Sequence, residues 1–146
     1  MRKTVALLIF AAVVVSMVSS VLAVRQTGKP ANNNGVVKAS NVGIYQDFDC
    51  TEALSCASWG TVASGTSNNM TIYIRNLGNA AVVLNMTVTS WNPIAASSCL
   101  TCTWNREGFA LKAKGKVQAV LVLSVLDGTA DVTDFSFVTI ISGTEA

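Results

Sequence analysis

Apolar and polar residues alternate along most of the chain after residue 35. In residues 69–88 the apolar members are spaced two apart on either side of a short break: Met70, Ile72 and Ile74, then Val82, Leu84, Met86 and Val88. Side chains two apart share one face of a strand, so this stretch predicts two strands that each bury one face. The break, residues 76–79, reads Asn-Leu-Gly-Asn and predicts a tight turn. The stretch is therefore predicted to be an antiparallel hairpin.

Other short runs of β type lie between turn residues: 36–45, 57–63, 99–105, 109–112, 117–126 and 132–142. No run after residue 35 places its apolar residues at helical spacing. About seven short strands with turns at close intervals are typical of immunoglobulin-like β-sandwiches. The sequence therefore predicts an all-β fold, an antiparallel immunoglobulin-like β-sandwich, preceded by an N-terminal apolar helix.

Residues 117–126 are apolar on both faces of the predicted strand. One face carries Val117, Ala119, Leu121, Leu123 and Val125, and the other carries Val120, Val122 and Leu126 beside polar residues. Val138 and Ile140 give the last predicted strand a second apolar face in the same way. Two explanations stay open: a partner strand or subunit covers the second face, or long side chains of neighbouring strands cover it.

The first 23 residues form an apolar run behind the short basic start Met1-Arg2-Lys3. Small residues at its end are typical of a secretory signal peptide, here cleaved between Ala23 and Val24. The run is also long enough to span a bilayer, so an uncleaved membrane anchor is the alternative. A pilin-type helix fits less well, because the run has no Gly or Ala before it and no Glu just inside it. We expect an exported protein that lies outside the cell or at its surface.

Residues 24–35 contain Gly, Pro and three consecutive Asn residues without apolar periodicity, which predicts a flexible leader. Residues 36–146 are then the β-sandwich domain, long enough for one core. Loss of residues 1–23 removes Arg2 and Lys3, so the ten basic and eight acidic residues become eight of each. A net charge near zero without a basic stripe gives no support for a nucleic-acid partner.

The four cysteines form two close pairs in the sequence, Cys50 with Cys56 and Cys99 with Cys102. An even set in an exported chain favours disulfides over a structural zinc site, although four thiolates would suffice for zinc. Cys50–Cys56 closes easily over a short loop, and Cys99–Cys102 then follows by elimination. The second pair requires a bend, because residues three apart in an extended strand lie about 10 Å apart. A crossed pairing of the two segments stays open, and a redox role has little support.

Two tripeptides, Asn69-Met70-Thr71 and Asn85-Met86-Thr87, fit the N-glycosylation sequon. Both asparagines are predicted to point away from the apolar face of their strands. Export would therefore expose them to modification. The alternative is chance, because Asn, Thr and Ser are common in polar strands.

Catalytic chemistry has little support in this composition. The chain has no histidine, which removes the usual Ser-His and Cys-His dyads and the commonest metal ligand. Aspartates at 47 and 49 and at 127, 131 and 134 have spacings compatible with a weak Ca²⁺ site, but their neighbours favour turns. Trp59, Trp91 and Trp104 are better explained by strand packing than by carbohydrate stacking. We predict no enzymatic activity, metal or cofactor.

Several motifs occur in a fixed order: Trp59-Gly60-Thr61-Val62, Ser64-Gly65, Tyr73-Ile-Arg-Asn-Leu-Gly-Asn79, Ser90-Trp-Asn-Pro93 and Asp134-Phe-Ser-Phe137. Over roughly residues 40–143 they make the chain resemble small secreted archaeal proteins with one immunoglobulin-like sandwich. Similar sandwiches form archaeal surface threads and bundling pili, in which an N-terminal segment of one subunit completes the sheet of the next. Related domains also sit singly on the cell surface.

The resemblance implies a strand donated between subunits, either from the leader or from residues 36–45, with Val36, Val37, Val42 and Ile44 as candidates. A leader of this length spans up to about 40 Å when extended, enough to reach a neighbour. An added strand would satisfy the edge of the accepting sheet. We therefore expect a structural subunit of a cell-surface filament, whose partners are further copies of itself and other surface proteins or glycans. The alternative is a monomeric binding or adhesion module, secreted or tethered to the membrane.

Overall fold

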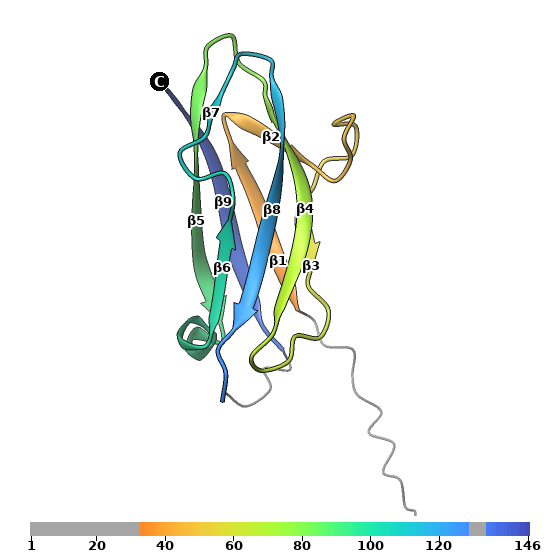
Figure 1. The fold of residues 1–146 in the computed structure, drawn as a ribbon, viewed down its shortest axis with the longest axis vertical. Helices are drawn as coiled ribbons and strands as arrows, with labels where there is room; N and C mark the ends of the chain where they lie inside the picture. Colours follow the sequence, from red (N-terminus) through yellow and green to blue (C-terminus); the bar gives the residue numbers. More distant parts are fainter. Residues whose placement is uncertain (1–32, 129–133) are drawn as a thin grey trace, which may run out of the picture.

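Two β-sheets pack face to face in the computed structural model, which describes residues 33–128 and 134–146 (Figure 1). The first sheet has the strand order β3-β1-β9-β5-β7, and the second has the order β2-β4-β8-β6. The elements are β1 (Asn34–Ser40), β2 (Val42–Tyr45), β3 (Cys56–Ser58), β4 (Ser67–Asn76), β5 (Val82–Asn92), the 3-10 helix η1 (Ile94–Ser98), β6 (Leu100–Trp104), β7 (Ala110–Leu111), β8 (Lys116–Val125) and β9 (Ser136–Glu145).

The core lies between the sheets and is built from alternate residues of the long strands. Its largest fully buried side chains, each at most 1% exposed, include Ile72, Ile74, Leu121, Leu123, Phe137 and Ile141. Burying one such side chain stabilises the fold by about 1.5–3 kcal/mol. The period-two prediction and the all-β sandwich are therefore confirmed for the described residues, with nine strands instead of about seven.

The predicted strand 36–45 is two strands that belong to different sheets. β1 pairs with β9, whereas β2 pairs with β4. Val37 is buried at an odd position, but Val42 and Ile44 are buried at even positions, so the chain must break its alternation between them. Asn41 provides that break with φ 63°, a left-handed conformation that Asn tolerates better than most residues.

The β1·β9 pairing is parallel, so the sandwich is not purely antiparallel as predicted. β1 also pairs antiparallel with β3 along its other edge. Parity along a strand reports which face is buried but carries no information about the direction of the neighbouring strand. For this reason the sequence pattern did not distinguish the two directions.

The predicted hairpin in residues 69–88 is wrong, because β4 and β5 lie in opposite sheets. The connection between them is an arch across the core. Both arrangements bury the same side chains, so the apolar pattern fits either one. Asn76 holds the arch: its side-chain amide donates to the carbonyls of Ala80, Leu111 and Lys112 at 2.7, 3.2 and 3.1 Å, and its Oδ1 accepts from Gly78 N at 2.9 Å.

The segment 1–23, the predicted cleavage position between Ala23 and Val24, and leader residues 24–32 lie outside the described residues. Within the two described ranges, no helix is both long enough and apolar enough to cross a membrane. β1 begins at Asn34, two residues before the predicted start of the domain.

Candidate functional site: the N-terminal strand and the sheet edges

The first described strand, β1, is inserted between β9 and β3 of the first sheet. Residues Asn34 to Ser40 are in register with Ser136 to Ser142, and Asn34 to Val36 are in register with Ser58 to Cys56. Both edges of the strand therefore carry ladder hydrogen bonds over its first residues. A segment held in this way makes the contacts that a strand donated by another molecule would make.

The floor beneath β1 is aromatic. Phe137 stacks with Trp59 and Trp91 at ring-centroid distances of 6.2 and 4.5 Å. Gly35 lies directly over this floor, because a Cβ at that position would be 3.1 Å from Trp59 Nε1 and 3.2 Å from a Phe137 ring carbon. A larger residue at this position would require the Trp59 and Phe137 rings to shift by a few tenths of an ångström. The site is thus matched in shape to β1.

Asn33 fixes the start of β1. Its side chain is 1% exposed, donates to Gly60 O and accepts from Phe135 N at 3.2 Å. Its backbone carbonyl accepts from Trp59 N at 2.8 Å. Sequence reasoning placed Asn33 in the flexible leader, because three consecutive asparagines show no apolar period. What identifies Asn33 is the burial of its amide between two loops, and the order of residues along the chain does not reveal such a contact.

The four candidate inter-subunit residues divide into two pairs. Val36 and Val37 are in β1, with Val36 on the outer face at 43% exposure and Val37 in the core. Val42 and Ile44 are core residues of β2 in the other sheet. Only the first pair therefore belongs to the strand that lies between β9 and β3.

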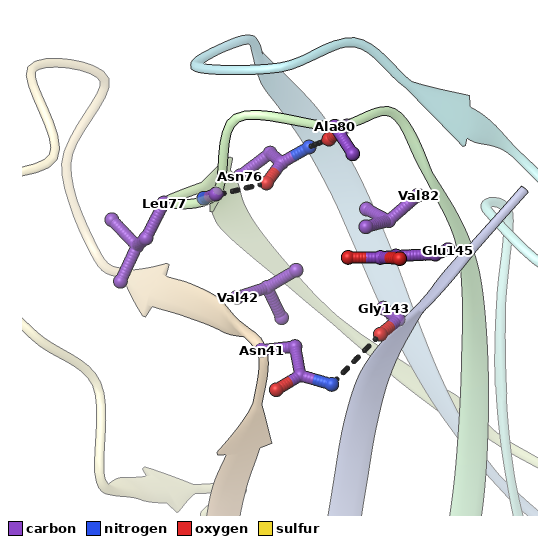
Figure 2. Close-up of a pocket in the computed structure, with 9 residues that line it drawn as sticks. Asn41, Val42, Asn76, Leu77, Ala80, Val82, Gly143 and Glu145 are labelled. Carbon is purple, nitrogen blue, oxygen red and sulfur yellow. Dashed lines mark hydrogen bonds between the residues drawn. The ribbon is translucent and has the colours of Figure 1, made fainter.

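A hollow of about 460 Å³ opens where the chain passes from β1 to β2 (Figure 2). Val42 points into it from the second sheet, and Val82 and Glu145 point into it from the first. Asn41 donates from Nδ2 to the carbonyl of Gly143 at 3.2 Å. Register pairs join β9 to β1 only as far as Ser142, so this amide occupies the edge of β9 just beyond the end of β1.

Side chains also protect other sheet edges. Glu107 accepts a hydrogen bond from Met86 N on β5 at 3.1 Å and from Trp104 Nε1 on β6 at 2.6 Å, so one carboxylate joins the two sheets. Asn105 accepts from Val120 N at 2.9 Å just beyond the end of β6. Such polar coverage discourages unspecific strand addition.

The first half of β4 is paired along only one of its edges within the described chain. β2 pairs with Tyr73 to Asn76 of β4, so Ser67 to Thr71 have register partners in β8 alone within the described chain. A groove of about 360 Å³ lies beside this stretch, lined by Gln46, Leu54, Cys56, Ser58, Met70 and Thr71. Asn68 crosses from β4 to donate to Trp59 O at 2.9 Å.

The four cysteines are free thiols in the structure, so the disulfide pairings stay predictions. Cys50 is buried in the loop after β2, and Cys56 is exposed on β3. Cys99 is the residue that follows η1 and caps it, and Cys102 points into the core from β6. The bend that a Cys99–Cys102 pair requires therefore lies at Cys99. Burial raises the pKa of the Cys102 thiol to about 11, although a hydrogen bond with Thr139 lowers it slightly.

Asp47 organises the loop between β2 and β3. Its carboxylate accepts hydrogen bonds from Glu52 N at 2.8 Å, from Thr51 N at 3.0 Å and from Thr51 Oγ1 at 2.8 Å. These bonds, led by the one from Glu52 N, lower the pKa of Asp47 to about 2. Asp127 similarly accepts from Gly128 N at 2.9 Å. Both aspartates thus act as turn residues, and no three potential metal ligands gather within residues 33–128 and 134–146.

The two sequons lie on opposite outer faces of the sandwich. Asn69 is on β4 and is exposed, whereas Asn85 is on β5 and is half-buried opposite Ser142. The hairpin prediction had placed them on one face. The arch between β4 and β5 separates them.

No protein-family model and no curated protein matches the chain. Among solved structures, the chain is similar to an ASH/PapD-like domain of human CEP192 (PapD-like domain 7), with 12% sequence identity and a TM-score of 0.37, over 89% of this chain and 98% of that domain.

Proposed function

We propose that the protein is an extracellular structural subunit that assembles into a cell-surface filament by exchanging β1 between copies. The observation that carries the proposal is the placement of β1. It lies between β9 and β3, with Gly35 in close contact with Trp59 and Phe137, and it is connected to β2 through Asn41. The apolar segment 1–23 supports export.

Exchange of this strand conserves its interactions. If β1 of one copy replaced β1 of the next, the Val37 side chain, the Gly35 contact and both hydrogen-bond ladders would be reproduced in trans. Such swapping of an identical element is a low-cost route to assembly. The remaining cost is the lost freedom of the joined molecules, about 4–15 kcal/mol for a free pair. Concentration of subunits at a membrane surface would reduce it.

Asn41 is the natural hinge. It is exposed, its φ is 63°, and it separates a strand of the first sheet from a strand of the second. A rotation there would release β1 while leaving β2 paired with β4 through Val42 to Tyr45. The Asn41–Gly143 hydrogen bond is the side-chain contact that such a movement would break.

A second candidate function is a monomeric binding or adhesion module at the cell surface. The pairing of β1 within its own chain supports it, because the first sheet is then complete without a partner. In this case the segment 1–23 would serve as an anchor or would be removed on secretion.

Electron microscopy of material sheared from cells that express the full-length protein tests the proposal, together with N-terminal mass spectrometry of the same sample. We expect filaments whose subunits begin at Val24. Monomers that retain residues 1–23 would rule out the filament and favour the tethered module.

A further inference from the structure

The outer face of the second sheet carries an apolar stripe that its own neighbours leave partly uncovered. Val120 and Val122 of β8 are half-buried and point away from the core, since Ala119, Leu121 and Leu123 between and beside them are buried. β8 is an inner strand of this sheet, with β4 on one side and β6 on the other.

The residues beside the stripe are short and polar. Asn69 and Thr71 of β4 lie opposite Val122 and Val120, and Thr103 of β6 lies opposite Val122. No long side chain therefore lies directly opposite these valines, and Tyr73 of β4 reaches only the Val120 end of the stripe, from the diagonal position. The apolar surface and the sequon Asn69-Met70-Thr71 are direct neighbours.

Asn69 is better placed for modification than Asn85. Asn69 and Thr71 are both exposed and share the outer face of β4, as residues two apart in a strand must. Asn85 is half-buried, and its Nδ2 makes a long, 3.4 Å hydrogen bond to Val83 O. The nitrogen that would carry a sugar is thus less accessible in the second sequon.

We propose that Asn69 carries an N-linked glycan whose first sugars lie over Val120 and Val122, and that Asn85 is left unmodified. Directly opposed side chains on neighbouring strands have Cβ atoms about 4.5–5.5 Å apart, so a sugar ring attached to Asn69 reaches Val122 at once. Pyranose rings present C–H groups on their faces, which cover apolar side chains while their hydroxyls stay in water. The glycan would thereby remove apolar surface from water.

The inference rests on the export that is part of the proposed function, but not on assembly. The first experiment expresses the full chain in a host that exports and N-glycosylates proteins, and measures site occupancy by glycopeptide mass spectrometry. Thr71→Ala and Thr87→Ala are matched variants, since each removes one sequon and leaves its asparagine in place. We expect the glycan to disappear in Thr71→Ala and to be unchanged in Thr87→Ala.

An exported chain that is bare at Asn69, or modified at Asn85, would overturn the inference even if the chain forms filaments. A chain that stays inside the cell without a glycan would overturn it together with the proposed export. Filaments and monomers are both acceptable samples, so glycan occupancy and assembly are judged separately.

The packing of the glycan has its own test. Enzymatic removal of the sugars should lower the melting temperature of the native sequence by about 2–4 °C, because the two valines lose their cover and a fraction of a kcal/mol in the free energy of unfolding shifts the melting temperature of a domain of about 110 residues by this amount. In the Val120→Thr, Val122→Thr variant the same treatment should have less effect, because the stripe is then polar. An equal shift in both proteins would show that the sugars do not lie on the stripe.

Discussion

A cysteine at position 36 would report directly whether β1 pairs within one chain or between chains. Val36 lies opposite the native Cys56 in the antiparallel β1·β3 pair, and both side chains are exposed on the outer face. The hydrogen bonds Val37 N to Ser55 O and Trp59 N to Asn33 O belong to alternate register positions, so residues 36 and 56 form a non-hydrogen-bonded pair. Their Cα atoms are then about 4.5 Å apart, within the range that a disulfide requires.

Val36→Cys should therefore oxidise readily, with little effect on the fold, because surface substitutions usually change stability by less than about 0.5 kcal/mol. A disulfide within one chain closes a loop of about 20 residues and should stabilise the monomer by about 3 kcal/mol. Exchange of β1 between chains instead gives covalent oligomers. Non-reducing gel electrophoresis of sheared filaments distinguishes the two outcomes, and we expect a ladder that reducing agent collapses to one band.

A filament preparation that contains only the internal disulfide would refute strand exchange, since its β1 would be paired in cis. The absence of any 36–56 disulfide would refute the register itself. Cys50→Ser removes a competing thiol and is the appropriate background. Lys38→Cys is the matched control, because it is exposed on the same strand but lies beyond the residues that pair with β3.

Four further outcomes follow from the structure. Asn76→Ala removes the amide that binds the carbonyls of Ala80, Leu111 and Lys112, so the free energy of unfolding measured in urea should fall by about 2–4 kcal/mol. The control Asn79→Ala, at the exposed tip of the arch, should change it by no more than about 0.5 kcal/mol. Equal losses in the two variants would contradict the role given to Asn76. Gly35→Ala places a Cβ 3.1 Å from Trp59 Nε1 and 3.2 Å from a Phe137 ring carbon, and this overpacking should cost about 1–3 kcal/mol in the same assay. A neutral result would contradict a close fit of β1 on these two rings. The pKa of Asp47 is lowered from 3.8 to about 2, so its contribution to stability is complete above pH 3.8 and is lost as the pH falls through about 2. Asp47→Asn should therefore lack this part of the acid transition when the melting temperature is measured between pH 2 and 5. An acid profile identical to that of the native sequence would count against the hydrogen bonds of this loop. In the reduced protein at pH 8, Cys102 should react with iodoacetamide at least about 100-fold more slowly than exposed Cys56, because burial raises the pKa of Cys102 to about 11. Peptide mass spectrometry measures the labelling of each cysteine. Comparable labelling of the two would disprove the burial of Cys102.

The alternation of apolar and polar residues was sufficient to predict the strands, but not to predict which strands pair with each other. The alternation in residues 117–126 and 132–142 identified β8 and β9, since a strand that buries one face must alternate. The same alternation is satisfied by a hairpin and by an arch, and it did not reveal that β4 and β5 lie in opposite sheets. The buried side chain of Asn76, which links the arch to β7, is a long-range contact that the turn sequence does not encode.

The candidate site shows the same limit. The imperfect alternation of residues 36–45 was visible in the sequence, and its cause is the change of sheet at Asn41. Neither the direction of β1 nor its aromatic floor follows from spacing, because Trp59, Trp91 and Phe137 come from three distant parts of the chain. Asn33, the residue that fixes the start of the strand, lies in a run whose composition alone indicates a linker.

The parallel pairing of β1 with β9 has a mechanical consequence. β1 starts at one end of the sandwich, and β9 finishes at the opposite end (Figure 1), so tension between these two ends pulls the strands past each other along their length. The register from Asn34–Ser136 to Ser40–Ser142 is then loaded in shear, with its hydrogen bonds sharing the force, instead of being opened one at a time like a zipper. Force applied between the beginning and the end of the described domain would therefore load all the hydrogen bonds of this pair of strands together.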